Sequence, residues 1–159
     1  MSNESIEIVR ATSDVHFATA KELFLEYAAG LGVDLCFQDF DTELANLATQ
    51  YSPPTGALLL ATVDGRAAGC VALRRWDADT CEMKRLYVRE PFRRLKLGRR
   101  LAVDIIDEAR TFGYRRMRLD TLPSMQAAQS LYRTLGFNDV SAYRYNPVAG
   151  TVYMELDLA

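Results

Sequence analysis

The sequence of 159 residues has little cysteine and a single histidine, His16. Its three cysteines, Cys36, Cys70 and Cys81, are odd in number, and no two of them form a Cys-x-x-Cys pair. This pattern disfavours both a disulfide framework and a zinc site. Cys81 is a conceivable nucleophile, but His16 lies far from it in the sequence, so a Cys/His catalytic pair has little support. We therefore expect reduced thiols and no metal.

Long apolar runs are also missing. No stretch approaches the ~20 apolar residues that a membrane-spanning helix needs. The first residues, MSNESIEIV, lack the positive segment and apolar run of a secretory signal. Repeats, low-complexity segments and linkers are absent as well, and 49% of the residues are hydrophobic. We expect one globular domain over residues 1–159, located in the cytoplasm and without a membrane partner.

The hydrophobic pattern predicts alternating strands and helices. Ser13 is a candidate N-cap for the first helix, which Gly30 and Gly32 end, and Ser124 is a candidate N-cap for the last. Asp64 and Gly65 are typical of a tight hairpin turn. Strands are expected at 6–9, 57–63, 67–76, 80–88, 114–121, 137–143 and 151–158, and helices at 14–30, 40–49, 98–112 and 125–135.

The order of these elements defines the fold class. Three consecutive strands, at 57–63, 67–76 and 80–88, form an antiparallel meander. The strand, helix, strand order that follows implies a parallel crossover. The expected fold is therefore α/β (α+β), with a central mixed, mostly antiparallel sheet flanked by about four helices.

Positive charge gathers in one segment. Between Lys84 and Arg100 eight residues are basic and only Glu90 is acidic, although the chain carries a net charge of -2. A helix is expected to start at Gly98, where unpaired backbone N–H groups and the helix dipole favour an anion such as a phosphate. The segment is therefore predicted to be an anion site. The side chains around this helix start are Arg93, Arg94, Lys96, Arg99 and Arg100.

The motifs in this segment resemble those of the GNAT superfamily of acyl-CoA-dependent N-acyltransferases, and the order of elements is similar over nearly the whole chain. The resemblance implies the GNAT fold and a cradle for the pyrophosphate of acetyl-CoA as cosubstrate. Lys96 stands where the family's first glycine is usual. A lysine with left-handed backbone there would cost on the order of 1 kcal/mol, which its charge could offset at a phosphate. The resemblance assigns cofactor binding to Leu86, Tyr87, Val88, Arg93, Arg94, Leu95, Lys96, Leu97, Gly98 and Arg99.

Two residues are candidates for the proton transfers of acyl transfer to an amine. Glu82, six residues before Val88, resembles the general-base glutamate of several GNAT enzymes. The alternative is an ion pair with Lys84 or an arginine on an exposed strand face. An undisturbed strand would place Glu82, Lys84, Leu86 and Val88 on one face, and a bulge would change this.

Tyr132 lies in a segment similar to the family's A-x-x-LY-x-x-x-GF, whose tyrosine acts as general acid toward the CoA sulfur. Met125 replaces the asparagine usual in that segment, which removes one polar contact to the pantetheine arm or its surroundings. The alternative for Tyr132 is a core aromatic ring with its hydroxyl at the edge. Val88 is a candidate for an oxyanion contact through its N–H.

Two loops, at 35–40 and 143–147, are candidate walls of the acceptor site. The acceptor would be a small-molecule or peptide amine. Two alternatives to an acetyltransferase are a non-catalytic CoA-binding sensor and a nucleic-acid-binding module. The sequence pI of about 5.5 disfavours the module, so no nucleic-acid partner is expected. A homodimer through exposed strand edges is a further expectation.

Overall fold

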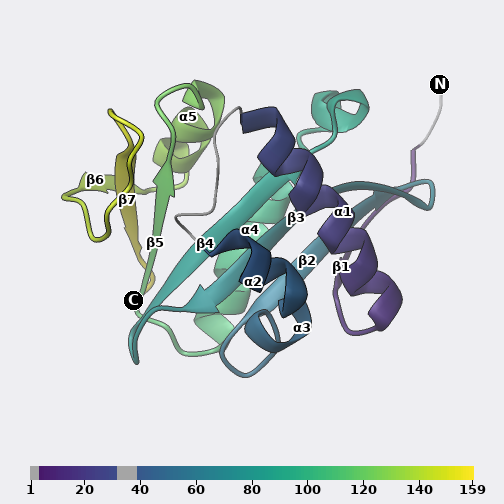
Figure 1. Ribbon diagram of the computed structural model, residues 1–159, viewed down its shortest axis with the longest axis horizontal. Coiled ribbons are helices and arrows are strands. Elements are labelled where there is room, and N and C mark those ends of the chain that lie inside the picture. The colour runs from purple at the N-terminus through teal and green to yellow at the C-terminus, as the bar shows by residue number, and fades with distance from the viewer. Residues whose placement is uncertain (1–3, 32–38) are drawn as a thin grey trace.

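A seven-stranded sheet runs through the computed structural model (Figure 1), which describes residues 4–31 and 39–159. The strand order is β1-β2-β3-β4-β5-β7-β6, and among the described strands only β4 and β5 pair in parallel. The expected mixed, mostly antiparallel sheet is confirmed. The strands are β1 Ile6–Arg10, β2 Ala57–Val63, β3 Arg66–Arg75, β4 Thr80–Val88, β5 Arg116–Thr121, β6 Asn138–Val140 and β7 Val152–Asp157.

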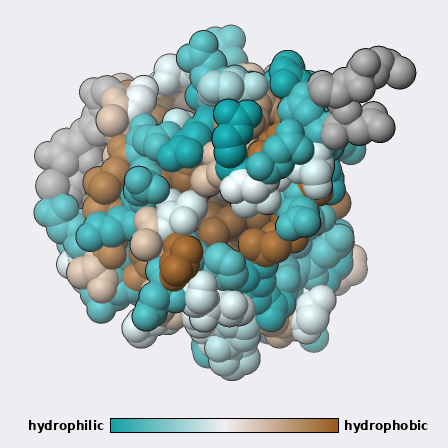
Figure 2. All heavy atoms as spheres, turned by 90° about the vertical axis from the view of Figure 1, so that its right-hand side faces the viewer, coloured by the Kyte–Doolittle hydropathy of each residue, from teal (hydrophilic) through white to brown (hydrophobic). Residues whose placement is uncertain are grey.

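Helices cover both faces of the sheet (Figure 1). One core lies between the sheet and α1 to α3, and a second lies between the sheet and α4 with α5. In Figure 2, which shows the side where β1 forms the sheet edge, apolar side chains appear in a central band among hydrophilic ones. No helix of the described residues is long and apolar enough to cross a membrane. The helices are α1 Asp14–Leu31, α2 Phe40–Ala45, α3 Leu47–Gln50, the 3₁₀ helix η2 Glu90–Leu95, α4 Leu97–Thr111 and α5 Gln126–Thr134.

The local signals in the sequence differ in how well they predicted element ends. Ser13 caps α1, because its Oγ accepts the His16 N–H at 3.2 Å. Asp64 and Gly65 both have left-handed backbone, with φ of 51° and 80°, as the tight hairpin requires. The prediction that Ser124 caps the last helix was wrong, because Met125 is the residue before α5 and it makes no side-chain cap bond. The helix expected at 40–49 is interrupted at Asn46, where φ is -131°.

A bulge in β4 changes which way its side chains point. Arg85 has a φ of 61°, and the β3–β4 register shifts between Cys70 and Ala72. As a result Leu86 packs on the α4 core together with Met83, which lies two residues before the bulge. The expectation that Glu82, Lys84, Leu86 and Val88 share one face was therefore wrong, because the bulge inserts a residue that breaks the alternation.

Gly69 allows β3 to approach the end of β4 closely. A Cβ on Gly69 would lie 2.6 Å from the Tyr87 carbonyl oxygen and 3.3 Å from Val88 Cα, both backbone atoms. We expect Gly69→Ala to lower the free energy of unfolding by about 1–3 kcal/mol, as overpacking does. Urea denaturation measures this, with Gly30→Ala as control, since its added Cβ would meet nothing within 4 Å. Equal destabilisation by both variants would contradict the close approach.

Candidate functional site

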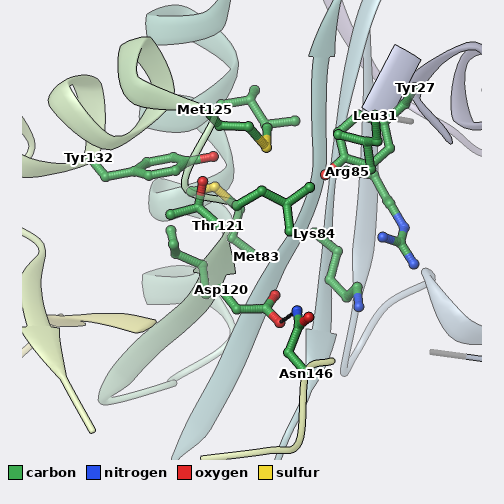
Figure 3. Close-up of a pocket in the computed structure, with 13 residues that line it drawn as sticks. Tyr27, Leu31, Met83, Lys84, Arg85, Asp120, Thr121, Met125, Tyr132 and Asn146 are labelled. Carbon is green, nitrogen blue, oxygen red and sulfur yellow. Dashed lines mark hydrogen bonds between the residues drawn. The ribbon is translucent and has the colours of Figure 1, made fainter. Parts of the chain in front are cut away.

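The parallel strands β4 and β5 stay together over only three residue pairs, from Thr80↔Arg116 to Glu82↔Arg118. Beyond Glu82 the two strands separate, and a pocket opens between them (Figure 3). We call it the β4–β5 pocket. It is lined by Tyr27, Leu31, Met83, Lys84, Arg85, Leu86, Leu119, Asp120, Thr121, Leu122, Met125, Tyr132 and Asn146. The separated part of β4 thus provides an edge to which an extended, amide-containing molecule can add.

The start of α4 lies near the end of β4, at Leu97, one residue before the start that the sequence predicted. Lys96 precedes the helix with left-handed backbone, φ 58° and ψ 31°, and provides no side-chain cap bond. The first bond of the helical type runs from the Arg100 N–H to the Lys96 carbonyl, at 3.3 Å. The amides of residues 97–99 come before that bond, so they are available to an anion.

The basic side chains around this helix start differ in their contacts. Arg93 Nε donates to the Val88 carbonyl at 2.9 Å, which ties the loop to the end of β4. Arg94 pairs with Glu4 at 2.8 Å. Lys96 and Arg99 are exposed. These four side chains lie on η2 and around the start of α4, and their binding of an anion stays a prediction.

The left-handed backbone of Lys96 gives a measurable expectation. Lys96→Gly should relieve strain on the order of 1 kcal/mol but remove a positive charge beside the anion site. Because the two effects oppose one another, we expect the CoA dissociation constant to change less than tenfold, under ~1.4 kcal/mol. Calorimetric titration with CoA measures this. A loss beyond a hundredfold would make Lys96 a principal phosphate ligand.

Tyr132 projects from α5 into the β4–β5 pocket, with its hydroxyl between Met125 and Thr121 (Figure 3). Burial raises its pKa well above the usual value, so the phenol keeps its proton at neutral pH. The ring packs against Phe137, with 5.6 Å between ring centroids. Thr121 Oγ1 is buried without a hydrogen-bond partner among the described residues. The pocket therefore holds a protonated phenol and an unpaired hydroxyl oxygen.

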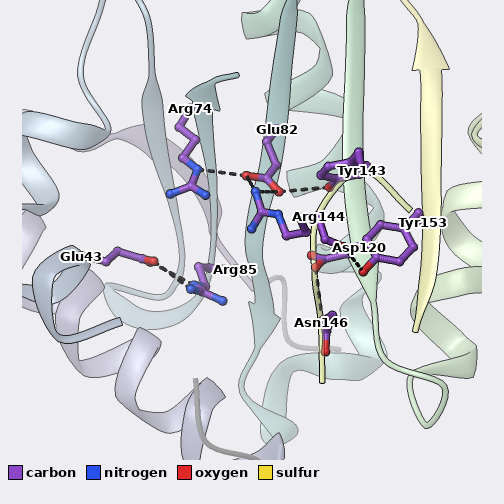
Figure 4. A network of polar contacts seen from close by, with 9 residues as sticks. All are labelled: Glu43, Arg74, Glu82, Arg85, Asp120, Tyr143, Arg144, Asn146 and Tyr153. Carbon is purple, nitrogen blue, oxygen red and sulfur yellow. Dashed lines mark hydrogen bonds and ion pairs between the residues drawn. The ribbon is translucent and has the colours of Figure 1, made fainter. Parts of the chain in front are cut away.

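Glu82 lies in a network of polar contacts rather than among the residues that line this pocket (Figure 4). Its carboxylate accepts Arg74 Nε at 2.9 Å, and also the Tyr143 hydroxyl at 3.0 Å and Arg144 Nη2 at 2.7 Å. Burial raises the pKa of Glu82, but the charges of Lys84, Arg74 and Arg144 outweigh it and hold that pKa below its usual range. These ion pairs agree with the alternative in which Glu82 pairs with an arginine. That alternative placed Glu82 on an exposed strand face, whereas its side chain is buried, with 1% exposed.

Asp120, which sequence reasoning missed, places a carboxylate in the β4–β5 pocket itself. It lies at the end of β5, beside Thr121, and accepts Asn146 Nδ2 at a long 3.5 Å. No local sequence pattern marks Asp120, because its place in the pocket depends on where β4 and β5 separate.

The two loops predicted as acceptor-site walls, at 35–40 and 143–147, are described in part. Asn146 lines the β4–β5 pocket, while Arg144 and Tyr145 line a second cavity with Asp39. Residues 35–38 lie outside the described residues. The Phe40 ring packs under the Arg85 guanidinium, whose Cζ lies 5.2 Å from the centroid of that ring.

Cys81 is buried on the α4 side of the sheet, in the main core. Burial raises the pKa of its thiol to about 12, so it is not a reactive thiolate at neutral pH. Among residues 4–31 and 39–159, no cluster of three or more His, Cys, Asp or Glu side chains could hold a metal ion.

The sequence model of the Acetyltransferase (GNAT) family matches residues 21–137. The chain belongs to the GNAT acetyltransferase family. The observed sheet and helices have the GNAT fold, which confirms the resemblance drawn from the sequence.

Several proteins resemble this chain along most of its length. An uncharacterized N-acetyltransferase of Schizosaccharomyces pombe is 42% identical and covers 99% of this chain and 97% of its own. The human N-acetylaspartate synthetase is 31% identical over 74% of this chain and 39% of its own. A putative acetyltransferase of Salmonella typhimurium, solved with acetyl-CoA as its cofactor, superposes with a TM-score of 0.69 at 20% identity, covering 97% of this chain and 94% of its own.

Proposed function

We propose that this GNAT protein transfers the acetyl group of acetyl-CoA to a primary amine. The observation that carries the proposal is the separated edge of β4, which ends at the uncapped start of α4. A pyrophosphate fits at the amides of residues 97–99, with Arg93, Lys96 and Arg99 around it. The pantetheine arm would then follow Leu86 to Val88 toward Tyr132. The bound acetyl-CoA of the Salmonella protein supports the choice of cosubstrate.

The chemistry is a direct attack on the thioester. The amine nitrogen forms a bond to the carbonyl carbon, and the bond from that carbon to sulfur breaks. The amine loses one proton and the CoA sulfur gains one. The site must therefore supply a proton acceptor near the amine and a proton donor near the sulfur, and the Val88 N–H is our candidate for the oxyanion contact.

Tyr132 is the proposed proton donor. Its hydroxyl points into the pocket (Figure 3), and its raised pKa keeps it protonated until a thiolate forms beside it. Tyr132→Phe should lower kcat about 10²-fold or more and change the CoA dissociation constant less than threefold, because only a hydroxyl is removed from a packed ring. Steady-state kinetics and calorimetry measure the two quantities. A parent-like kcat would leave Tyr132 as a core aromatic ring.

Two carboxylates compete for the role of proton acceptor. Glu82 stays the prediction of the sequence, but its oxygens already accept bonds from Arg74, Tyr143 and Arg144. Asp120 lines the pocket beside Tyr132 and accepts only the long bond from Asn146 among the described residues. We therefore propose that Asp120 receives the ammonium group and its proton, directly or through water, and that Glu82 holds the two arginines in position.

Release of free thiol from acetyl-CoA, measured against a library of primary amines, tests this function. Turnover with at least one amine is expected. Binding of CoA without turnover on any amine would favour a CoA-binding sensor. Protection from heat unfolding by nucleic acid and not by acetyl-CoA would favour a nucleic-acid-binding module.

Several properties remain predictions. The cytoplasmic location and the absence of a nucleic-acid partner are two of them. A homodimer would use an open sheet edge, which β1 and β6 provide. The human relative is named for an N-acetylated amino acid, so free amino acids belong in the amine library.

A further inference from the structure

A second cavity, of about 360 Å³, opens beside the β4–β5 pocket. We call it the arginine pocket. Segment 144–146 joins the two, because Arg144 and Tyr145 line the arginine pocket and Asn146 lines the other. A molecule whose amine reaches Asp120 can therefore extend into the arginine pocket. The lining residues are Asp39, Thr42, Glu43, Gln50, Arg74, Arg144 and Tyr145.

Among the described residues, the buried and half-buried charges around the arginine pocket do not balance. Glu43 is occupied by Arg85, which donates to both carboxylate oxygens at 2.8 and 2.9 Å. Glu82 is shared between Arg74 and Arg144, so two guanidinium groups meet one carboxylate (Figure 4). The side chains of these two arginines are only 27% and 14% exposed, so water screens their charge incompletely.

Among the described residues, the remaining charged group in the wall is Asp39. Asp39 lines the arginine pocket but is exposed, at its rim. The pocket therefore favours an anion over a neutral or cationic ligand.

The N–H donors that remain on Arg74 and Arg144 suit a carboxylate ligand. Among residues 4–31 and 39–159, the hydrogen bonds of the Arg74 side chain run through Nε alone, and those of Arg144 run through Nη2 alone. A guanidinium carries five N–H donors in a planar fork that matches a carboxylate. The Tyr153 hydroxyl donates to the Arg144 carbonyl at 2.8 Å, which fixes this loop against β7.

Two further observations mark the arginine pocket as a binding site for a polar molecule. Gln50 Oε1 is buried there without a hydrogen-bond partner among the described residues. Tyr145 lies at the rim with 80% of its surface exposed. A buried unpaired oxygen is costly unless a ligand or water donates to it, and an exposed aromatic ring is suited to ligand contact.

We propose that Arg74 and Arg144 bind a carboxylate of the acceptor, so that the acceptor is an amine that also carries a carboxylate. The inference rests on the proposed acetyl transfer, since it names the substrate class of the same site. Glu82 then acts as a positioning residue, which holds the two guanidinium groups so that their other N–H donors face the ligand.

Calorimetric titration of the CoA-saturated protein tests the carboxylate site. The probes are glycine, L-alanine, L-aspartate and L-glutamate, each compared with the amide in which every carboxylate is amidated. We expect at least one acid to bind tenfold or more tightly than its amide. If no acid binds at least tenfold more tightly than its amide, or if no acid binds at all, the proposed carboxylate site is wrong.

Variants locate the site within the molecule. Arg144→Gln should weaken binding of the preferred acid at least tenfold and leave the CoA dissociation constant within twofold. Arg10→Gln is the matched control, because Arg10 also pairs with one glutamate, Glu108, but lines neither pocket. Equal acid binding by parent and Arg144→Gln would overturn the assignment. If Arg144→Gln does not fold, the comparison of acids with amides in the parent decides.

The same probes in the thiol-release assay separate this inference from the proposed function. Turnover of neutral amines alone would overturn the carboxylate site and keep acetyl transfer. Selective binding of acids without thiol release would keep the carboxylate site and contradict acetyl transfer.

Discussion

Asp120→Asn is expected to lower kcat about 10²- to 10⁴-fold at neutral pH, the usual contribution of a general base. The variant keeps the shape of the side chain and loses its proton affinity. A primary amine with a pKa near 10 is almost fully protonated at pH 7 and increasingly free above pH 9. The loss should therefore shrink as pH rises. The measurement is kcat against pH from 6 to 10, with the acceptor found by thiol release.

Glu82→Gln is the competing variant in the same experiment. If Glu82 only positions Arg74 and Arg144, its replacement should raise the acceptor KM and lower kcat without recovery at high pH. Recovery by Glu82→Gln, together with a parent-like profile for Asp120→Asn, would instead make Glu82 the base, as the sequence predicted.

The stability of Glu82→Gln provides a readout that does not depend on turnover. Breaking a buried ion pair costs about 3 kcal/mol. The pKa of Glu82 is lower in the folded than in the unfolded chain. Its contribution to stability is therefore present above the unfolded pKa and is lost as pH falls toward the folded one. The gap between parent and variant should close in acid, and a gap independent of pH would contradict the ion pairs.

Gly98→Asp is expected to weaken CoA binding more than about 100-fold, roughly 2.7 kcal/mol. A carboxylate there would lie in the first turn of α4, where it repels the phosphate groups and competes for the same amides. Calorimetry should give a micromolar to sub-millimolar dissociation constant for the parent. Equal binding by the variant would show that the start of α4 does not hold CoA.

Gly98→Ala is the control for the size of the side chain. A Cβ at Gly98 would lie 3.9 Å from Leu131 Cδ2 and 4.0 Å from Val88 Cγ2, which are ordinary contacts. Alanine should therefore leave CoA binding close to that of the parent. An acidic residue near a helix start does not weaken the helix, so unfolding would not account for the loss with aspartate.

Features governed by neighbouring residues could be predicted from the sequence. The Asp64–Gly65 hairpin was one, because only a few residue types accept its backbone. The motif also raised a left-handed backbone at Lys96 as a condition, and the structure has it. The family motif placed the predicted anion site because the motif is a run of neighbouring residues.

Features that depend on distant segments could not be predicted. Arg74, Glu82 and Arg144 come from β3, β4 and a loop before β7, and nothing near any one of them in sequence indicates the others. Asp120 faces a pocket only because β4 and β5 separate after three pairs. The bulge at Arg85 likewise gave no local signal, so strict alternation failed there.

The short pairing of β4 with β5, three residue pairs like that of β6 with β7, also makes this junction a weak main-chain connection within the sheet. Few backbone hydrogen bonds oppose its local opening, so amide hydrogens near residues 80–82 and 116–118 can exchange with solvent without global unfolding. A cosubstrate bound between the two strands would bridge both sides and oppose that opening. The C-terminal part of the sheet, β5 to β7, would thus be attached to the rest partly by the molecule that the protein binds.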